Sequence, residues 1–255
     1  MVILQHDIVW EDSAPTRTHL EPMVANAVAA GANFVVLPEM FATGFSANTQ
    51  AISEPFDGPT ARWLKAMAKQ HQIHIVGSIC EEPNRSEPAD SGLPGNIAVL
   101  AGPDGINHRY AKKHLFTYVG ENERIAPGSD LLTVDIGGVR VSVLICYDLR
   151  FGDDFWALAA ETDAYVVIGN WPQARISHWR SLLISRAIEN QAWVIGANRI
   201  GSGGKLDYSG DSLIVDPMGE VCADGAGGAQ MALSCEVDAT EVQRVRDRYP
   251  FLLDR

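Results

Sequence analysis

The sequence predicts an α/β protein with a mixed β-sheet. Short runs rich in β-branched residues alternate along the chain with amphipathic stretches of helical period, which is the pattern of strands and helices that pack together. Several short runs, such as 165–168, are apolar on both faces, as expected when both sides of a sheet are covered. No repeat, low-complexity tract or long linker divides the chain, so residues 1–255 are predicted to form a single domain.

The expected elements follow one another closely. In the first two hundred residues, apolar β-branched runs predict strands at 34–37, 73–77, 96–100, 139–145, 165–168 and 193–196. Helical spacing of apolar residues predicts helices at 17–30, 60–70, 177–191 and 240–247. Three later strands are expected at 211–215, 220–223 and 233–237, the first two joined by a turn at 216–219. Polar or glycine-rich segments predict surface loops at 81–95, 202–205 and 225–228.

Composition favours a folded protein and disfavours several functions. Apolar residues make up 46% of the chain and charged residues 20%, which argues against global disorder. The net charge of −12 repels phosphate backbones and there is no basic patch, so nucleic acid is not an expected partner. The longest apolar stretches are too short to span a bilayer, and the N-terminus lacks the basic start of a secretory signal, so no membrane association is expected.

The cysteines and histidines indicate no metal site. Cys80, Cys146, Cys222 and Cys235 include no pair with CxxC spacing, and a chain of this size needs no disulfides. They are expected to be reduced thiols of a cytoplasmic protein. The seven histidines form no compact ligand set, so neither a metal nor another cofactor is expected.

Glu39 follows the predicted buried strand 34–37, across a proline. Ligands of α/β proteins bind at the carboxyl ends of strands. A carboxylate there is partly desolvated, which raises its pKa toward that of a useful general base. The alternative is a strand-end glutamate that is simply solvated.

Cys146 ends the predicted strand 139–145 in the same way and is followed by polar residues. As a nucleophile it needs a neighbouring base or cation to form a thiolate. The alternative is an ordinary buried cysteine that behaves as a small apolar side chain.

The adjacent pair Lys112 and Lys113 is either part of a surface turn or the source of an inward-pointing ammonium. An inward lysine would lower a thiol pKa and stabilise a developing oxyanion. His114 and His178 remain candidates for a Cys–His arrangement, although each is expected to serve in packing or hydrogen bonding.

Six motifs, in order along nearly the whole chain, resemble the nitrilase or carbon–nitrogen hydrolase superfamily. Each motif is weak alone, whereas six in the right order are a strong signal. They are Gly31-Ala-Asn-Phe-Val-Val-Leu-Pro-Glu39, Tyr110-Ala-Lys-Lys-His-Leu-Phe116, Cys146-Tyr-Asp-Leu-Arg-Phe151, Asn170-Trp-Pro172, Arg186-Ala-Ile-Glu-Asn190 and Gly210-Asp-Ser-Leu-Ile-Val-Asp-Pro-Met-Gly219. The resemblance implies an α/β fold that is a four-layer α-β-β-α sandwich, usually assembled into homodimers or larger homo-oligomers through its outer layer.

The resemblance also implies the site residues. The Glu-Lys-Cys triad of the family falls on Glu39, Lys112 and Cys146, with Lys112 chosen because the family lysine lies two residues before the histidine of the His-Leu-Phe run. A second active-site glutamate, which in the family orients the lysine and the substrate, matches Glu121 more loosely. No cofactor takes part in the family's chemistry.

Two stretches, 37–46 and 164–199, resemble the omega-amidases. These enzymes hydrolyse the side-chain amide of 2-oxo acids such as 2-oxoglutaramate and 2-oxosuccinamate. One departure is Gly152, which stands where many relatives have proline and could change the loop beside Arg150 and therefore the specificity.

The expected mechanism is acyl transfer through a thioester. Glu39 takes the proton of Cys146, and the thiolate attacks the amide carbonyl. Lys112 and the backbone N–H of Tyr147 stabilise the oxyanion. Glu39 then protonates the departing ammonia and activates the water that releases the acid.

A small-molecule substrate of this kind carries a free carboxylate, which a guanidinium binds well. Arg150 is the preferred partner and Arg175 the second candidate, although Arg150 could instead form a salt bridge with an acidic residue of 148–154. Trp171 and Phe45 are expected to wall the pocket, unless they only belong to the core.

Two rival functions stay open. The same triad would serve another amidase, an N-carbamoyl amino acid hydrolase or a nitrilase with a different pocket. A non-catalytic binding protein of the same fold is the other alternative, and the presence of the complete triad argues against it.

Overall fold

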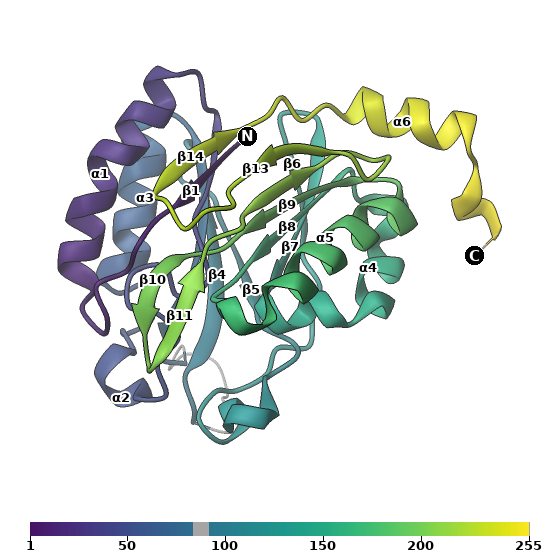
Figure 1. Cartoon of the computed structure of the whole chain (residues 1–255). Helices are drawn as coiled ribbons and strands as arrows, with labels where there is room; N and C mark the ends of the chain where they lie inside the picture. Colours follow the sequence, from purple (N-terminus) through teal and green to yellow (C-terminus); the bar gives the residue numbers. More distant parts are fainter. Residues whose placement is uncertain (84–91, 255) are drawn as a thin grey trace.

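The computed structural model describes residues 1–83 and 92–254, which form four layers (Figure 1). Two six-stranded sheets lie face to face, and helices cover the outer face of each sheet. The structure thereby confirms the α/β class and the α-β-β-α sandwich. None of the helices in these described residues has the length and apolarity that crossing a bilayer requires.

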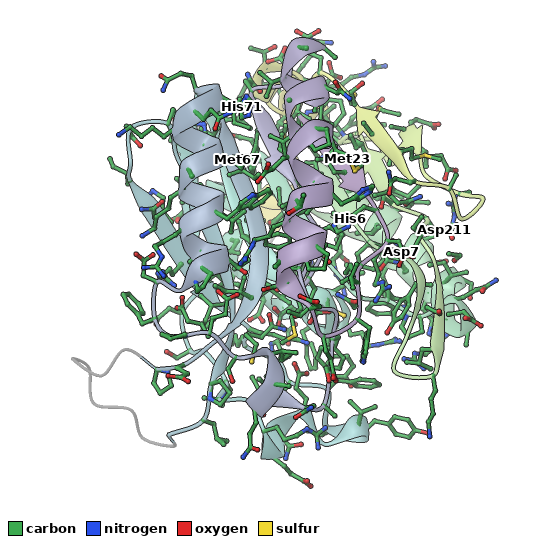
Figure 2. All side chains as sticks on the ribbon, turned by 90° about the vertical axis from the view of Figure 1, so that its left-hand side faces the viewer. His6, Asp7, Met23, Met67, His71 and Asp211 are labelled. Atoms are coloured by element: carbon green, nitrogen blue, oxygen red, sulfur yellow. The ribbon has the colours of Figure 1, made fainter. Side chains whose placement is uncertain are left out.

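The first sheet has the strand order β14-β1-β2-β3-β4-β5. Strands β1 to β3 run parallel, and the outer strands pair antiparallel. Helices α1 and α3 lie side by side over its outer face (Figure 2). The bounds are β1 Val2–Gln5, α1 Ser13–Ala29, β2 Phe34–Val36, α2 Thr49–Ile52, α3 Pro59–His71, β3 His74–Glu81, β4 Gly95–Ala101, β5 Asn107–Ala111 and β14 Met231–Ser234.

The second sheet has the order β13-β12-β9-β8-β7-β6, with β7 to β9 parallel. Helices α4 and α5 cover its outer face, a hairpin of β10 and β11 stands apart, and α6 projects from the sandwich (Figure 1). The bounds are β6 Thr133–Ile136, β7 Val139–Ile145, α4 Gly152–Leu158, β8 Ala164–Ile168, α5 Ile176–Asn190, β9 Trp193–Ala197, β10 Ile200–Gly203, β11 Leu206–Ser209, β12 Leu213–Val215, β13 Val221–Asp224 and α6 Ala239–Arg248.

The central strands are apolar on both faces because each face meets a different core. In β2, Phe34 and Val36 point into the core between the two sheets, whereas Val35 packs beneath α1 and α3. In β7, Val143 faces the same intersheet core and Leu144 packs beneath α4 and α5. This alternation follows from the two-residue period of a strand.

Several elements differ from the sequence-based expectations. Helix α1 begins four residues before position 17, because the side chain of Asp12 caps it by accepting a hydrogen bond from the N–H of Ala14. Strands β1, β5, β6, β10 and β11 were not predicted, since they are short or carry polar residues. The loop predicted at 202–205 is wrong in its first half, which belongs to β10. Of the loop predicted at 81–95, positions 84–91 lie outside the described residues.

Candidate active site

The ends of four strands, two from each sheet, meet at one place. Glu39 lies shortly after β2 and Lys112 directly after β5, both in the first sheet. Cys146 directly follows β7, and Asn170 lies just after β8, both in the second. Lys112 Nζ donates to Glu39 Oε1 at 2.9 Å, and the Cys146 thiol lies within electrostatic reach of both groups. The structure therefore brings the three predicted triad residues together.

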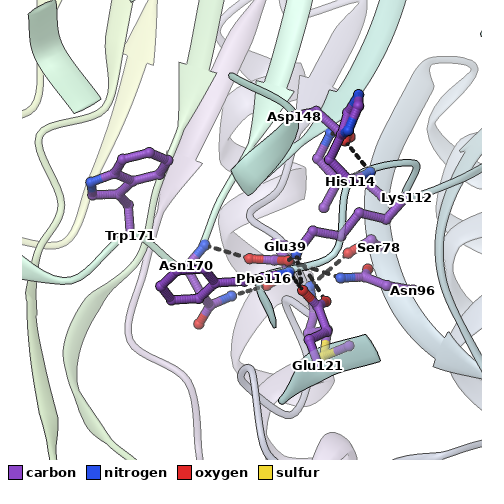
Figure 3. A network of polar contacts seen from close by, with 12 residues as sticks. Glu39, Ser78, Asn96, Lys112, His114, Phe116, Glu121, Asp148, Asn170 and Trp171 are labelled. Atoms are coloured by element: carbon purple, nitrogen blue, oxygen red, sulfur yellow. Dashed lines mark hydrogen bonds and ion pairs between the residues drawn. The ribbon is translucent and has the colours of Figure 1, made fainter. Parts of the chain in front are cut away.

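The carboxylate of Glu39 is fully buried and held on both oxygens (Figure 3). Besides the lysine contact, Oε1 accepts a hydrogen bond from Asn96 Nδ2 at 2.8 Å. Oε2 accepts one from the backbone N–H of Asn170 at 2.9 Å, and the Asn170 amide donates to the backbone oxygen of Glu39. The alternative of a solvated strand-end glutamate is therefore wrong.

Asn96 and Asn170 were not assigned a role from the sequence. Asn170 offered a signal, because it follows an apolar strand just as Glu39 and Cys146 do. Asn96 offered none, because its amide projects from within β4 and its partner is 57 residues away in the chain.

Lys112 points inward and is almost completely buried. Its Nζ also donates to Glu121, at 2.9 Å from Oε1 and 3.1 Å from Oε2. Burial acts to lower the pKa of Lys112, but the negative charges of Glu39 and Glu121 outweigh it and the pKa is raised. The side chain is therefore an ammonium held between two carboxylates. Lys113 instead pairs with Asp154 near the surface, so the structure supports the choice of Lys112.

Glu121 touches the lysine, as the looser motif match predicted. Its Oε2 also accepts a hydrogen bond from the backbone N–H of Phe116 at 2.6 Å. Burial raises the pKa of the Glu121 carboxyl, Lys112 opposes this, and the charge of Glu39 raises it further. The short turn that carries Glu121 is therefore fastened to the segment that follows Lys112.

Cys146 opens the 3-10 turn Cys146–Arg150 with a φ of +47°, in the left-handed region that non-glycine residues rarely occupy. Its thiol is half-buried at the pocket. Burial and the charge of Glu39 raise the pKa of Cys146 well above its ordinary value, and Lys112 only partly lowers it. The expected effect of an inward lysine, a lowered thiol pKa, is therefore present, but burial and the charge of Glu39 outweigh it.

Neither histidine candidate takes the place of the base. The His114 ring stacks on Phe151, with centroids 3.6 Å apart, and contacts the carboxylate of Asp154. His178 Nδ1 lies 3.2 Å from the guanidinium of Arg150. Both serve in packing and hydrogen bonding, as expected.

A pocket of about 150 Å³ opens in front of the thiol. Lys112, Cys146 and Tyr147 line its base, and its walls are largely aromatic. The expected wall residues Phe45 and Trp171 are present. Three further aromatic residues line the pocket and were missed by sequence reasoning: Phe116, Tyr118 and Tyr208.

Arg150 and Arg175 both line the pocket with their guanidinium groups against aromatic rings. Arg150 lies 4.8 Å from the centroid of Trp171, and Arg175 lies 5.5 Å from that of Phe116. Within residues 1–83 and 92–254, neither arginine forms a salt bridge to a carboxylate. The alternative of an internal ion pair between Arg150 and residues 148–154 is therefore wrong, and both cations remain available to a ligand.

Gly152 begins α4 and lies outside the pocket lining. A Cβ atom at this position would stand 3.1 Å from Nη1 of Arg186. The same guanidinium donates to the backbone oxygen of Leu149 at 2.9 Å. The absence of a side chain at Gly152 thus leaves room for Arg186, whose guanidinium supports the backbone of the turn Cys146–Arg150.

The comparisons with known proteins agree with this geometry. The carbon–nitrogen hydrolase family model matches residues 3–247. The chain is 34% identical to an omega-amidase of Escherichia coli over 98% of this chain and 94% of that one. It is 37% identical to the 2-oxoglutaramate amidase of Bacillus subtilis, over 88% and 85%. A carbon–nitrogen hydrolase superfamily protein of Xanthomonas campestris superposes with a TM-score of 0.90 at 31% identity, covering 100% of this chain and 97% of that one. The chain therefore belongs to the carbon–nitrogen hydrolase family of enzymes, as its six motifs predict.

Proposed function

We propose that this enzyme is an omega-amidase, which hydrolyses the side-chain amide of 2-oxo dicarboxylic acid monoamides to the acid and ammonia. 2-Oxoglutaramate and 2-oxosuccinamate are the expected substrates. The observation that carries the proposal is the buried Glu39–Lys112 pair beside the Cys146 thiol, at a pocket that also holds two guanidinium groups without carboxylate partners among the described residues. The similarity of this chain to an omega-amidase of Escherichia coli and to the 2-oxoglutaramate amidase of Bacillus subtilis supports the same substrate class.

In the first half of the reaction, the proton of the Cys146 thiol moves to Glu39 as sulfur attacks the amide carbonyl. Because burial and the charge of Glu39 raise the pKa of the thiol, transfer of its proton to a base accompanies the attack. Glu39 acts directly on the thiol through its charge, which makes it the base that takes the proton. When the tetrahedral intermediate collapses, the C–N bond breaks and Glu39 returns the proton to the leaving ammonia.

We assign the oxyanion to two donors. The ammonium of Lys112 lines the pocket beside the thiol. The N–H of Tyr147 lies in the first turn of the 3-10 helix that Cys146 opens, where backbone N–H groups have no partner within the helix. Water then attacks the thioester with Glu39 again as base, which releases the acid and restores the thiol.

The substrate carboxylate is assigned to Arg150, with Arg175 as the second candidate. A chain with a net charge of −12 repels a dianionic product and an anionic substrate, so a local cation is needed. Arg150 lies four residues after the thiol, with its guanidinium 4.8 Å from the ring centroid of Trp171 and 6.0 Å from that of Tyr147. These contacts hold the planar guanidinium in place for a bidentate pair.

An ammonia-release assay on a panel of amides tests the proposal. Turnover of 2-oxoglutaramate or 2-oxosuccinamate well above that of simple aliphatic amides is the expected result. Turnover of a carbamoyl compound or a nitrile, with none of either 2-oxo acid amide, would support the rival enzymes instead. Binding of these compounds without release of ammonia would support the non-catalytic alternative.

The remaining expectations stay predictions. We propose a single domain over residues 1–255, a cytoplasmic location, and a homodimer or larger homo-oligomer formed through the outer helical layer. Exposed apolar side chains support an assembly: Ile188 on α5, Met218 in the turn between β12 and β13, and Phe251 and Leu253 after α6. Light scattering coupled to size-exclusion chromatography measures the oligomer, and a monomer at micromolar concentration would contradict it.

A further inference from the structure

We propose that Asp148 is a positioning residue that sets the distance between the Lys112 ammonium and the Cys146 thiol. The inference rests on the proposed function and deepens it by naming a residue that the mechanism does not use directly. Asp148 is fully buried within the turn that follows the thiol. Its side chain contacts the segment that carries Lys112, which comes from the other sheet (Figure 3).

The carboxylate of Asp148 accepts three hydrogen bonds. Oδ2 accepts from the backbone N–H of Ile145 at 2.9 Å and from the hydroxyl of Tyr110 at 2.8 Å. Oδ1 accepts from the backbone N–H of His114 at 2.8 Å. Tyr110 and His114 flank Lys112 by two residues on each side, and Ile145 immediately precedes Cys146. One side chain therefore fixes both segments.

Only an ionised carboxylate satisfies all three donors at once. It has two oxygens and about four lone-pair sites, and it donates to nothing. Burial raises the pKa of Asp148, while the two backbone N–H groups and the nearby Lys112 charge oppose this. An asparagine of the same shape would turn one of the two acceptor oxygens into an NH₂ group. Whichever oxygen is replaced, the NH₂ group would face a backbone N–H, so the hydrogen bond from Ile145 or the one from His114 would be lost.

Asp154 provides a matched comparison. It belongs to α4 and contacts the same segment, but through the side chains of Lys113 and His114 rather than through the backbone. Both of these partner side chains are partly exposed. Movement of either side chain leaves the backbone beside Lys112 in place, so this contact cannot set the position of the ammonium.

The experiment compares Asp148→Asn with Asp154→Asn in the full chain. A displacement of about 1 Å at a reacting group costs on the order of 100-fold in rate, so we expect kcat of Asp148→Asn to fall about 10- to 100-fold with KM within about twofold. Asp154→Asn is expected to keep kcat within about twofold. Equal losses of kcat in Asp148→Asn and Asp154→Asn would overturn the proposal.

A second readout separates positioning from general loss of structure. Lys112 lowers the pKa of Cys146, so a retreating ammonium must raise it further. The pH profile of Cys146 alkylation by iodoacetamide is therefore expected to move to higher pH in Asp148→Asn and to stay unchanged in Asp154→Asn. An unchanged profile in a folded Asp148→Asn protein would overturn the proposal.

Tyr110→Phe removes one of the three hydrogen bonds and keeps Asp148. It is therefore the test variant to use if Asp148→Asn does not fold. It is expected to move the alkylation profile in the same direction by a smaller amount, and an unmoved profile would again overturn the proposal. The alkylation readout needs no substrate. It therefore distinguishes a failure of this inference from a wrong substrate assignment.

Discussion

The two sheets contribute unlike halves to the site. From the first sheet and the short turn that follows it come Glu39, Lys112 and Glu121, all buried, with both carboxylates bound to the ammonium by charge-assisted hydrogen bonds. From the second come Cys146 and Arg150, half-buried and facing the pocket. The first half is organised before any substrate arrives, which is how charge stabilisation is most effective. The second half contacts the substrate, and selectivity is expected to lie there.

The burial of charged groups in the first half costs stability. Two carboxylates and one ammonium of the first half are taken out of water, and their mutual contacts, together with a few hydrogen bonds from amide and backbone N–H groups, compensate for that. The second half keeps contact with solvent through the pocket. Substitutions in the second half are therefore expected to lower activity with little loss of stability, whereas substitutions in the first half are expected to lower both.

The largest effect on turnover is expected in the second half, from Cys146→Ala. Removal of a nucleophile typically costs about 10⁴-fold or more in kcat. The free energy of unfolding should change by no more than about 1 kcal/mol, because the side chain is small and borders the pocket. Ammonia release and urea denaturation measure the two quantities, and Cys222→Ala on the exposed strand β13 is the control. Turnover of Cys146→Ala at the original rate would refute the nucleophile assignment.

Lys112→Met should lower both kcat and the free energy of unfolding. Loss of one oxyanion donor costs about 100- to 1000-fold in kcat. The two carboxylates lose their buried counter-charge, which destabilises the fold by about 3–5 kcal/mol. The destabilisation should shrink as the pH falls, because burial raises the pKa of Glu121 and its protonation removes part of the uncompensated charge. A variant as stable as the parent at pH 7 would contradict the proposed role of the first half.

Arg150→Met should act on selectivity alone. A lost hydrogen bond to a charged group is worth about 1.5–3 kcal/mol, so KM for 2-oxoglutaramate should rise about 10- to 100-fold. KM for a neutral aliphatic amide should change little. Arg175→Met is the matched comparison, because its guanidinium lines the same pocket. A larger rise in KM for Arg175→Met than for Arg150→Met would assign the substrate carboxylate to Arg175.

The smallest effect concerns the resting thiol and links the two halves. The negative charge of Glu39 contributes to the raised pKa of Cys146. In Glu39→Gln that charge is absent, so the pH profile of Cys146 alkylation should move to lower pH even though turnover falls. A profile that moves to higher pH would show that Glu39 chiefly assists ionisation of the free thiol.

The strand pattern alone located two of the site residues. Glu39 and Cys146 each follow an apolar run, and the carboxyl ends of such strands are where sites form. Lys112 needed the family resemblance, because it follows β5, whose sequence Asn107–Ala111 is too polar to predict a strand. The resemblance likewise supplied Glu121 and the four-layer arrangement.

Other features could not be predicted, because they depend on contacts between distant parts of the chain. Asp148 binds residues 34 and 38 positions away, and no local spacing indicates this. The pKa of Cys146 is a balance of burial, one carboxylate and one ammonium. The sequence indicated that these groups lie together but not which of them dominates.

A trapped intermediate would test most directly the claim that both halves act on one sulfur atom. The enzyme is mixed with 2-oxoglutaramate, quenched in acid before the steady state, digested and measured by mass spectrometry. The account predicts a mass increase equal to the substrate minus ammonia on the peptide that contains Cys146, and none in Cys146→Ala. Ammonia release without an adduct on this peptide, or an adduct at another residue, would contradict it.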